Sequence, residues 1–582
     1  MPQHNALGLS PALDALIDGC LAGLEANLSA DPPALWDPHS KQDTPPSHYA
    51  YCSLALALHQ RKPGSPKWQT ALDAYLAIPK QKLGHHPFNR LLLLLLRDAL
   101  DKDNPLAVER VSTALQRCPL DRHYPSNNWT LLAQLCRILE GRTNPRAHQR
   151  AVADFERLLT RWMTPAGGFI DYPAKPKDGK GSTPIAYHHK ALFLTAVAVL
   201  YGGAHALAPR LQALLHWAIQ WIDQGGLCGG FGRTNHGLFG DACLLASLML
   251  LYRSGACTNP NLLDALSRIA ARLLRQQRED GLIWLTPAGA NGWDDYMHLS
   301  VYDAWFAATL VWASLTNLPR CGYRIEWAEP NEGIFLDEAA GLLAWRAQSA
   351  NGMVEAMVST TGQPPQGFAA TDAELRYAAG TVFNLTIGGE SFMPPPIRVG
   401  IDRLRQTPCL AGNIPVFEFN ERLYGFTTGS LDTLSKDSSQ LVLVFSGSPV
   451  ALTSYTDRRG FLARLVAAID WRLLGHRISK RRNLARPKIS QLHCKLKLII
   501  SASPPYLRQT LKLRISSTAN AYFINPRARS SVRYDASRLI QLHPYPSSLP
   551  GSHCISDKKI KISSASDPCD STFETENSQF LA

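Results

Sequence analysis

Apolar residues recur with helical spacing along the first ~315 residues, and Gly, Pro and Asn separate the apolar segments. This spacing predicts about twelve helices joined by connections short enough for antiparallel neighbours. The expected helices cover residues 10–27, 48–61, 67–78, 87–101, 105–117, 127–140, 147–162, 186–202, 208–223, 237–254, 260–277 and 299–315.

Twelve helices in antiparallel pairs indicate an (α/α)6 toroid, in which an inner and an outer ring leave a cleft at one end. The longer polar connections are the segments that we expect to line this cleft. They are rich in aromatic residues, His and Asn, which loops with a function often concentrate. They comprise residues 123–129, 167–189, 229–241 and 291–303.

After Pro319 the pattern changes to short β-branched segments bounded by turn residues, such as GTVFNLTIGG and QLVLVFSGS. Such segments are typical of strands in an antiparallel arrangement. We therefore expect an α+β multidomain protein with a helical toroid over 1–318 and a mostly antiparallel, β-sandwich-like domain over 319–545. The polar, Ser-rich residues 546–582 are expected to form a disordered tail.

Charge is distributed unevenly over the 582 residues, whose formal net charge is +13. The segment 471–534 contains 15 Lys or Arg and no Asp or Glu, so it accounts for the whole positive balance. Such a segment suits an acidic polymer or peripheral contact with an anionic membrane surface, and a solvated sheet face is the alternative. Nucleic acid is not an expected partner, because no recognised binding motif accompanies the charge.

The 12 cysteines are scattered without a CxxC pair, which favours buried thiols over disulfides or a zinc site. No apolar run reaches the ~20 residues that span a bilayer. The first residues lack the basic start of a secretory signal, so we expect a cytoplasmic protein. A periplasmic or exported location is the alternative if the start is mis-assigned.

Two short motifs resemble those of polysaccharide lyases of the alginate lyase and heparinase II/III type, which combine a helical toroid with a β-sheet domain. In alginate lyases of the toroid type, one helix begins with Asn-Asn-His and a later helix carries Tyr-His after a basic residue. This sequence has Asn127-Asn128-Trp129, then Lys180 and Tyr187-His188. It departs from the pattern at Trp129, where the family has a catalytic His.

The resemblance implies cleavage of a uronate polymer by β-elimination, without a cofactor or a metal. Asn128 would neutralise the uronate carboxylate, which makes the C5 proton more acidic. Tyr187 would act as base and then as acid, with His188 or Arg233 lowering its pKa. Because Trp129 replaces the family's His, we take His236, at the start of a predicted helix, as the substitute.

Further residues of these loops are expected to contact the substrate, and Trp129 among them to stack on a sugar ring. Structural roles stay open for the same residues, since Asn often caps a helix and a His or Tyr at a helix start often reaches water or a carbonyl. The expected substrate contacts are Asn127, Trp129, Lys180, His189, Trp293, Tyr296 and His298.

Two other functions remain open on the sequence. A toroid glycoside hydrolase would need two carboxyl groups beside the scissile bond, and the available residues are Asp171, Asp241, Asp294, Asp295 and Asp303. A non-catalytic glycan-binding or assembly protein of exopolysaccharide or lipopolysaccharide biosynthesis is the third possibility. The sequence contains no HExxH, Walker or Rossmann motif, so it indicates no metal or nucleotide cofactor.

Overall fold

The computed structural model describes residues 11–100, 104–121, 124, 126–171, 184–232, 237–287, 289, 298–362, 372–392, 396–406, 413–414, 416–419, 422–426, 429–437, 439–451, 465–466, 469, 474, 478, 492–503, 505–515 and 533–540. The chain divides into two compact units, and the described residues up to Asn331 form the first and those from Glu332 form the second. Within the described residues, no helix is long and apolar enough to cross a membrane.

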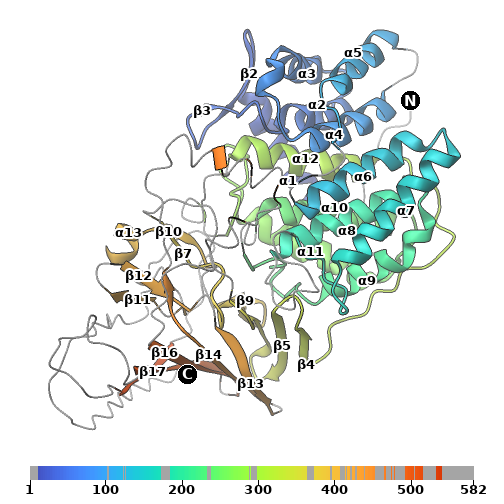
Figure 1. Ribbon diagram of the computed structural model, residues 1–582. Coiled ribbons are helices and arrows are strands. Elements are labelled where there is room, and N and C mark those ends of the chain that lie inside the picture. Colours follow the sequence, from blue (N-terminus) through green and yellow to red (C-terminus); the bar gives the residue numbers. More distant parts are fainter. Residues whose placement is uncertain are drawn as a thin grey trace. The chain divides into compact units, whose positions relative to one another are not determined.

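Six helices of the first unit form a closed inner ring, because each contacts the next and the last contacts the first (Figure 1). Most of their residues are buried, as expected for helices that are apolar on nearly all sides. In order around the ring they are α2 (Ala50–Arg61), α4 (His86–Ala99), α6 (Asn127–Gly141), α8 (Ile185–Leu200), α10 (Leu238–Arg253) and α12 (Leu299–Leu315).

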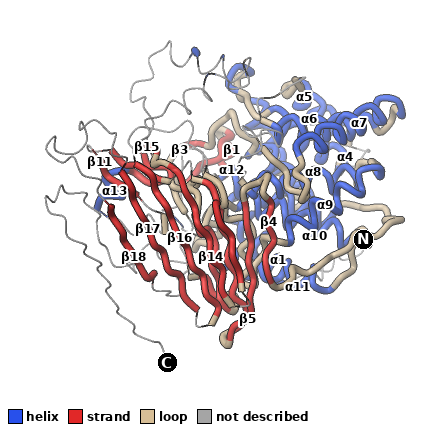
Figure 2. The backbone as a smooth tube through the Cα atoms, turned by 60° about the horizontal axis from the view of Figure 1, so that its bottom comes forward, coloured by secondary structure: helices blue, strands red, loops and turns tan. Residues whose placement is uncertain are grey.

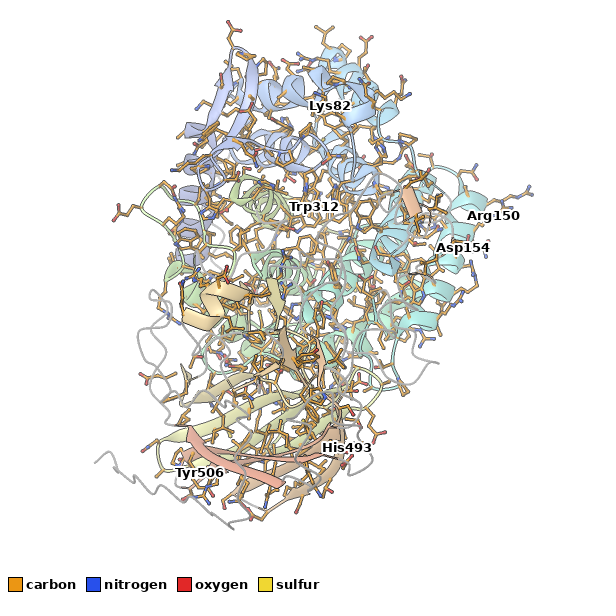
Figure 3. All side chains as sticks on the ribbon, turned by 60° about the vertical axis from the view of Figure 1, so that its left-hand side comes forward. Lys82, Arg150, Asp154, Trp312, His493 and Tyr506 are labelled. Atoms are coloured by element: carbon orange, nitrogen blue, oxygen red, sulfur yellow. The ribbon has the colours of Figure 1, made fainter. Side chains whose placement is uncertain are left out.

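Six further helices pack outside this ring, each against an inner helix that neighbours it in sequence or closes the ring. Figure 3 shows this outer position for α7, where Arg150 and Asp154 lie at the surface, whereas Trp312 of α12 lies inside the unit. The outer helices are α1 (Pro11–Ala26), α3 (Lys67–Ala77), α5 (Pro105–Gln116), α7 (Pro145–Trp162), α9 (Ala208–Ile219) and α11 (Pro260–Leu274). The predicted (α/α)6 toroid is thus confirmed, with helix ends within a few residues of those expected.

Three outer helices begin with the same Asn-Pro pair, in which Asn caps the helix and Pro occupies its first turn. Asn104 accepts a hydrogen bond from the backbone N of Ala107 at 3.2 Å, and Asn144 and Asn259 cap α7 and α11 in the same way. These residues satisfy backbone N–H groups that a helix start leaves without partners. The local sequence therefore specifies where these three outer helices begin.

The inner helices α8 and α10 approach closely at a glycine. A Cβ added to Gly240 would lie 2.7 Å from the Cβ of Ala186, a distance that real atoms do not reach. Gly240 therefore allows the first turns of the two helices to pack together. A small sheet of β1 (Leu28–Ala30), β2 (Pro33–Asp37) and β3 (Gln42–Asp43) follows α1 in the same unit.

The first unit extends beyond the predicted boundary at 318/319. The backbone N of Cys321 donates to Ser254 O at 2.9 Å and that of Ile325 to Ala256 O at 2.8 Å. Residues 319–331 are therefore bound along the helical unit by backbone hydrogen bonds. Their partners lie on the loop after α10.

The second unit contains two five-stranded antiparallel sheets whose inner faces share one apolar core. Leu343 and Trp345 of one sheet pack in the same cluster as Leu443, Phe445 and Leu496 of the other. This arrangement confirms the predicted β-sandwich-like domain. The first sheet has the order β4 (Gly333–Asp337), β5 (Leu342–Ser349), β6 (Gly352–Ser359), β8 (Val382–Ile387) and β9 (Glu390–Ser391).

The second sheet carries part of the basic segment, and Figure 2 shows its long strands side by side. Its order is β13 (Ser430–Lys436), β14 (Gln440–Gly447), β16 (Leu492–Ala502), β17 (Pro505–Ile515) and β18 (Arg533–Ile540). Along β16 the exposed residues His493, Lys495 and Lys497 alternate with buried Cys494 and Leu496. This period of two places the cations on the solvent face of the strand.

Smaller elements complete the second unit. They are β7 (Asp372–Glu374) paired with β10 (Arg398–Gly400), the helix α13 (Ile401–Gln406), and a sheet of β11 (Val416–Phe419), β12 (Arg422–Gly425) and β15 (Val450–Ala451). The tail predicted for residues 546–582 lies outside the described residues.

Candidate functional site

The first turns of the inner helices meet at one end of the ring, which we call the ring mouth. Aromatic and imidazole side chains from different helices contact one another there. The distances between the centroids of their rings are 5.5 Å for Tyr49–His85, 5.6 Å for Phe88–Trp129 and 6.0 Å for His48–His298. Half-buried polar or aromatic side chains gather at this end. They are His48, His85, Trp129, Tyr187, His298 and Tyr302.

A buried lysine lies beneath the ring mouth. Lys190 of α8 is 0% exposed, and its Nζ donates a hydrogen bond to Asn128 Oδ1 at 2.6 Å. The same Nζ lies 3.8 Å from the ring centroid of Phe88 and 5.9 Å from that of Phe239, within the range of a cation–π interaction. Burial lowers the pKa of Lys190 to about 7, because the charged form loses its hydration.

The amide of Asn128 connects this lysine to a carboxylate. Its Nδ2 donates to Asp171 Oδ2 at 2.9 Å and to Ser126 Oγ at 3.1 Å, and its backbone N donates to Asp171 Oδ1 at 2.9 Å. Asn128 is 3% exposed. The expectation that Asn128 faces a substrate carboxylate is therefore corrected, because its oxygen and nitrogen already have partners in the Lys190–Asn128–Asp171 network.

His188 occupies a structural position instead of a place at the ring mouth. Its ring is fully buried, its Nδ1 accepts a hydrogen bond from Phe169 N at 3.0 Å, and its Nε2 lies 2.9 Å from Leu214 O. Burial lowers its pKa, so the ring is neutral. The prediction that His188 lowers the pKa of Tyr187 is corrected, because a neutral ring has no charge for that effect.

His189 is also fully buried, between α8 and α10. Its ring lies beside Gly229 and Gly240, and burial lowers its pKa to about 3. An expected contact of His189 with substrate is therefore corrected as well. Successive residues of a helix point about 100° apart, so only one or two of four polar neighbours at its start can face the ring axis.

Tyr187 is the residue of that cluster that stays half-buried. It precedes Lys190 by three residues, which places the two side chains on one face of α8. The Tyr187 hydroxyl lies close enough to Tyr49 to contribute to the raised pKa of that buried phenol, whose main cause is burial. Tyr187 is therefore a partly accessible phenol one helical turn from the buried amino group of Lys190, which is about half protonated at pH 7.

Trp129 lies against a histidine that the sequence analysis did not select. Its ring centroid is 4.7 Å from that of His85 and 5.9 Å from that of Tyr124. Asn127, next to it, donates from Nδ2 to Ile170 O at 2.8 Å. Asn127 thus holds the loop before residue 172, and Trp129 remains half-buried at the ring mouth.

His298, the residue before α12, is brought to the same place. Its Nδ1 lies 3.2 Å from Ser40 Oγ, and Asp37 accepts hydrogen bonds from Ser40 and from the first turn of α12. These bonds lower the pKa of Asp37, although its burial acts in the opposite direction. The prediction that His298 contacts a substrate is compatible with this position.

Five predicted site residues lie outside the described residues, so the structure gives them no position. They are Lys180, Arg233, His236, Trp293 and Tyr296.

Sequence reasoning missed His48, His85 and Tyr49, and it did not assign Lys190 a role. His48 is the first residue of the helix predicted at 48–61, and His85 stands two residues before the helix predicted at 87–101. A search for titratable residues at the start of every inner helix would have found them. Such a search requires knowing which helices form the inner ring, and only the contacts between helices in the structure show this.

The carboxylates proposed for a hydrolase are sequestered where the structure describes them. Asp241 pairs with Arg272 at 2.8 Å, and both are almost fully buried. Asp303 accepts from the backbone N of Ile283 at 2.8 Å, and burial raises its pKa well above the usual value. Asp171 belongs to the Lys190–Asn128–Asp171 network, whereas Asp294 and Asp295 lie outside the described residues.

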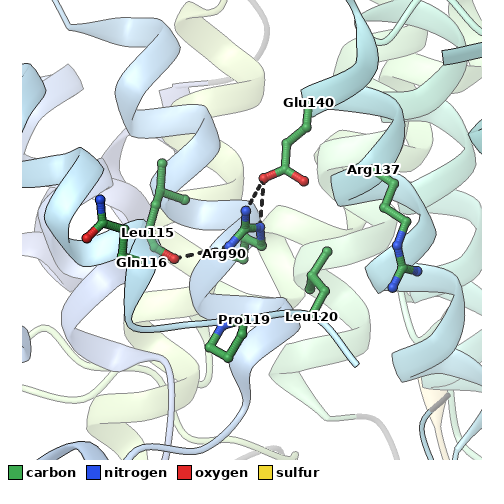
Figure 4. A pocket seen from close by; sticks show the side chains of 7 residues that line it. All are labelled: Arg90, Leu115, Gln116, Pro119, Leu120, Arg137 and Glu140. Carbon is green, nitrogen blue, oxygen red and sulfur yellow. Dashed lines mark hydrogen bonds and ion pairs between the residues drawn. The ribbon is translucent and has the colours of Figure 1, made fainter. Parts of the chain in front are cut away.

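A separate cavity of about 440 Å³ lies between α4, α5 and α6 (Figure 4). Its polar wall is formed by Arg90, which binds Glu140 and donates to Leu115 O at 3.1 Å. The side chain of Arg90 thus has partners within the protein, and no residue lining this cavity belongs to the ring mouth. Across the described ranges, no group of three or more His, Cys, Asp or Glu residues is arranged to hold a metal ion.

The sequence matches no protein-family model and no curated protein. Solved structures with a similar fold include heparinase III, with 10% identity, a TM-score of 0.45, and coverage of 89% of this chain and 73% of that one. A second is the GH76 alpha-mannanase of Bacteroides thetaiotaomicron, with 10% identity, a TM-score of 0.36, and coverage of 53% of this chain and 97% of that one. A third is cellobiose 2-epimerase from Spirochaeta thermophila, with 12% identity, a TM-score of 0.37, and coverage of 53% of this chain and 98% of that one.

Proposed function

We propose that this protein is a polysaccharide lyase that cleaves a uronate-containing acidic polysaccharide by β-elimination. The observation that carries the proposal is the position of Tyr187, half-buried at the ring mouth and one helical turn above the buried Lys190. A phenol is a proton donor and acceptor, and a nearby positive charge favours an anionic substrate at the same place.

Elimination at a uronate requires three events. The C5–H bond breaks and its electron pair forms the C4–C5 double bond, while the C4–O4 bond breaks and O4 receives a proton. In the simplest mechanism Tyr187 begins as the phenolate, takes the C5 proton to become the phenol, and then gives this proton to O4, which restores the phenolate. Lys190 stabilises the negative charge that develops on the carboxylate, acting through the low dielectric of the ring interior.

The surroundings of Tyr187 suit a sugar chain. Trp129 offers an aromatic ring for stacking on a pyranose, while His48, His85 and His298 offer hydrogen-bonding nitrogens. The proposed hydrolase alternative finds less support, because the described Asp candidates are buried and bonded within the protein.

The test is incubation with a panel of acidic polysaccharides, including alginate, a glucuronate-containing exopolysaccharide and a glycosaminoglycan. A lyase generates a C4–C5 double bond that absorbs in the ultraviolet, whereas a hydrolase generates reducing ends without this absorbance. Binding without either product would support the glycan-binding alternative instead.

A matched pair of variants links the activity to the site. Tyr187→Phe removes one hydroxyl and is expected to abolish turnover while binding is retained. Tyr201→Phe, at the other end of α8, removes a hydroxyl that binds Asp98 at 2.9 Å and is expected to leave activity unchanged. A fully active Tyr187→Phe variant would exclude the proposed role of Tyr187.

A further inference from the structure

Three neighbouring strands of the second sheet carry positive charge and no carboxylate. β14, β16 and β17 lie side by side in this sheet (Figure 2). Their sequences contain two Lys in β16, one Lys and two Arg in β17, and no Asp or Glu. The positive field of this group of strands is therefore not neutralised by its own residues.

The lysines of β16 form a row on the outer face of the sheet, which is the face opposite the apolar core. Exposed His493, Lys495 and Lys497 alternate with residues buried in that core. Alternate residues of a strand are about 7 Å apart, which sets the spacing of the row. A slip of the strand by one residue would turn the lysines into the core, so packing fixes the row on the outer face. Among the described residues, no carboxylate pairs with Lys495 or Lys497.

An apolar strip lies beside this row on the same face. Val444 of β14 stands directly opposite Lys497, and Val442 stands opposite Ile499 of β16. Residues directly opposite each other on neighbouring strands share a face of the sheet. Both valines and Ile499 are half-buried, and Arg508 of β17, opposite Ile499 on its other side, is exposed. The outer face thus combines separate cations with a low apolar surface.

This combination distinguishes between the polyanions that a basic surface binds. Duplex DNA carries one charge per about 1.7 Å of its axis, so a row of lysines about 7 Å apart would leave most phosphates without a partner. Peripheral membrane binding needs apolar side chains that reach into the lipid, whereas Val442, Val444 and Ile499 are half-buried within the sheet. A uronate polymer has one carboxylate on each acidic sugar, and its pyranose rings offer apolar C–H faces. Its charges are therefore separated by about the length of a sugar ring.

We propose that the outer face around Lys495, Lys497 and Arg508, which we call the cationic sheet face, is a second binding site for an acidic polysaccharide. The choice of a uronate polymer rests on the proposed function, because this polymer is also the proposed substrate at the ring mouth. The two sites are distinct, since the ring mouth belongs to the first unit and the cationic sheet face to the second. Carboxylates of the polymer pair with the exposed cations, and sugar rings lie against the apolar strip. Because these ion pairs are exposed to solvent, each is weak and sensitive to salt.

The test measures the binding of fluorescently labelled alginate and of a labelled glycosaminoglycan by anisotropy, from about 50 to about 200 mM salt. Readings are taken before unsaturated product accumulates. The double substitution Lys495→Ser and Lys497→Ser, here the β16 variant, is expected to bind both polymers about tenfold more weakly at the lowest salt. Its plot of log affinity against log salt is expected to be shallower by about 1.

Two controls accompany the β16 variant. Lys80→Ser with Lys82→Ser removes two exposed lysines that are also two residues apart, but on the first unit. It changes the net charge equally and is expected to bind within about twofold of the wild type, because its lysines lie outside the cationic sheet face. Vesicles of phosphatidylglycerol and phosphatidylcholine test the membrane as a partner, and we expect the wild type and the β16 variant to bind them equally. Circular dichroism checks folding, and Lys495→Gln with Lys497→Gln replaces the β16 variant if that variant is unfolded.

The possible results separate this proposal from the proposed function. Equal polymer binding by the β16 variant and the wild type, an equal loss in the Lys80 and Lys82 control, or no wild-type binding to either polymer would overturn the cationic sheet face. A loss of vesicle binding without a loss of polymer binding would overturn it in favour of a membrane contact. If the wild type binds through this face but forms no unsaturated product from any polymer, only the proposed lyase function fails.

Discussion

Replacing Lys190 with Met tests whether the site carries a charge at the expense of stability. Met is similar in length and apolar, so it fills the space beside Phe88 without an ammonium group. Burial lowers the pKa of Lys190 from 10.5 to about 7. This corresponds to a cost of about 4 kcal/mol at pH 7, because each unit equals about 1.4 kcal/mol and the folded-state lysine is only about half protonated at that pH. Losing the hydrogen bond to Asn128 offsets about 2 kcal/mol of that.

We therefore expect Lys190→Met to stabilise the helical unit by about 2 kcal/mol at pH 7, seen as a rise of several degrees in melting temperature. The same variant is expected to lose most of its activity. A gain in stability together with a loss of function is typical of a group retained for catalysis.

The difference in stability between Lys190→Met and the wild type is expected to depend on pH. Between pH 7 and 10.5 the unfolded chain binds a proton at this lysine that the folded chain does not, so wild-type stability rises with pH. The advantage of Lys190→Met is therefore expected to shrink as pH rises from 7 toward 10. The exposed Lys82 provides the control, and Lys82→Met is expected to show no such trend (Figure 3).

The measurement is thermal melting of the three proteins from pH 6 to pH 10, followed by circular dichroism at the helix signal. If Lys190→Met melts below the wild type by a margin that does not depend on pH, Lys190 is not a destabilising buried base. The account of the ring-mouth charge would then be wrong.

Three further predictions concern the scaffold and the second unit. Arg272→Met is expected to destabilise the helical unit by about 3–5 kcal/mol, because it leaves Asp241 buried without its cation; unchanged denaturant unfolding would contradict this. Asn104→Ala is expected to cost about 1 kcal/mol through loss of the α5 cap, measured as a lower melting temperature. Replacing Lys495 and Lys497 with Ser is expected to weaken retention on an anionic polysaccharide column without changing the melting temperature; equal retention would show that this face of β16 does not bind polyanions.

The helices of the toroid could be predicted from the sequence because their signals are local. The Asn-Pro pairs at 104–105, 144–145 and 259–260 mark helix starts within a few residues, and apolar spacing marks the helix bodies. The unit boundary was less accurate, because residues 319–331 are held by hydrogen bonds to residues distant in sequence.

The candidate site was less predictable, because helix rotation decides which residue of a polar cluster faces the ring axis. The run Tyr187 to Lys190 divides into a half-buried tyrosine, two buried structural histidines and a buried lysine. Those four orientations follow from packing against α6, α9 and α10, which are not visible in a local pattern. His85 was missed because its significance depends on contacts with His48 and Trp129 from other helices.

The most direct test of the central claim is mass spectrometry of the oligosaccharides that the wild-type protein releases from a uronate polymer. Elimination adds no water, so the account predicts unsaturated products, each one water lighter than the corresponding hydrolysis product, and none from Tyr187→Phe. Saturated products from the wild type, or unsaturated products from Tyr187→Phe at the wild-type rate, would contradict it.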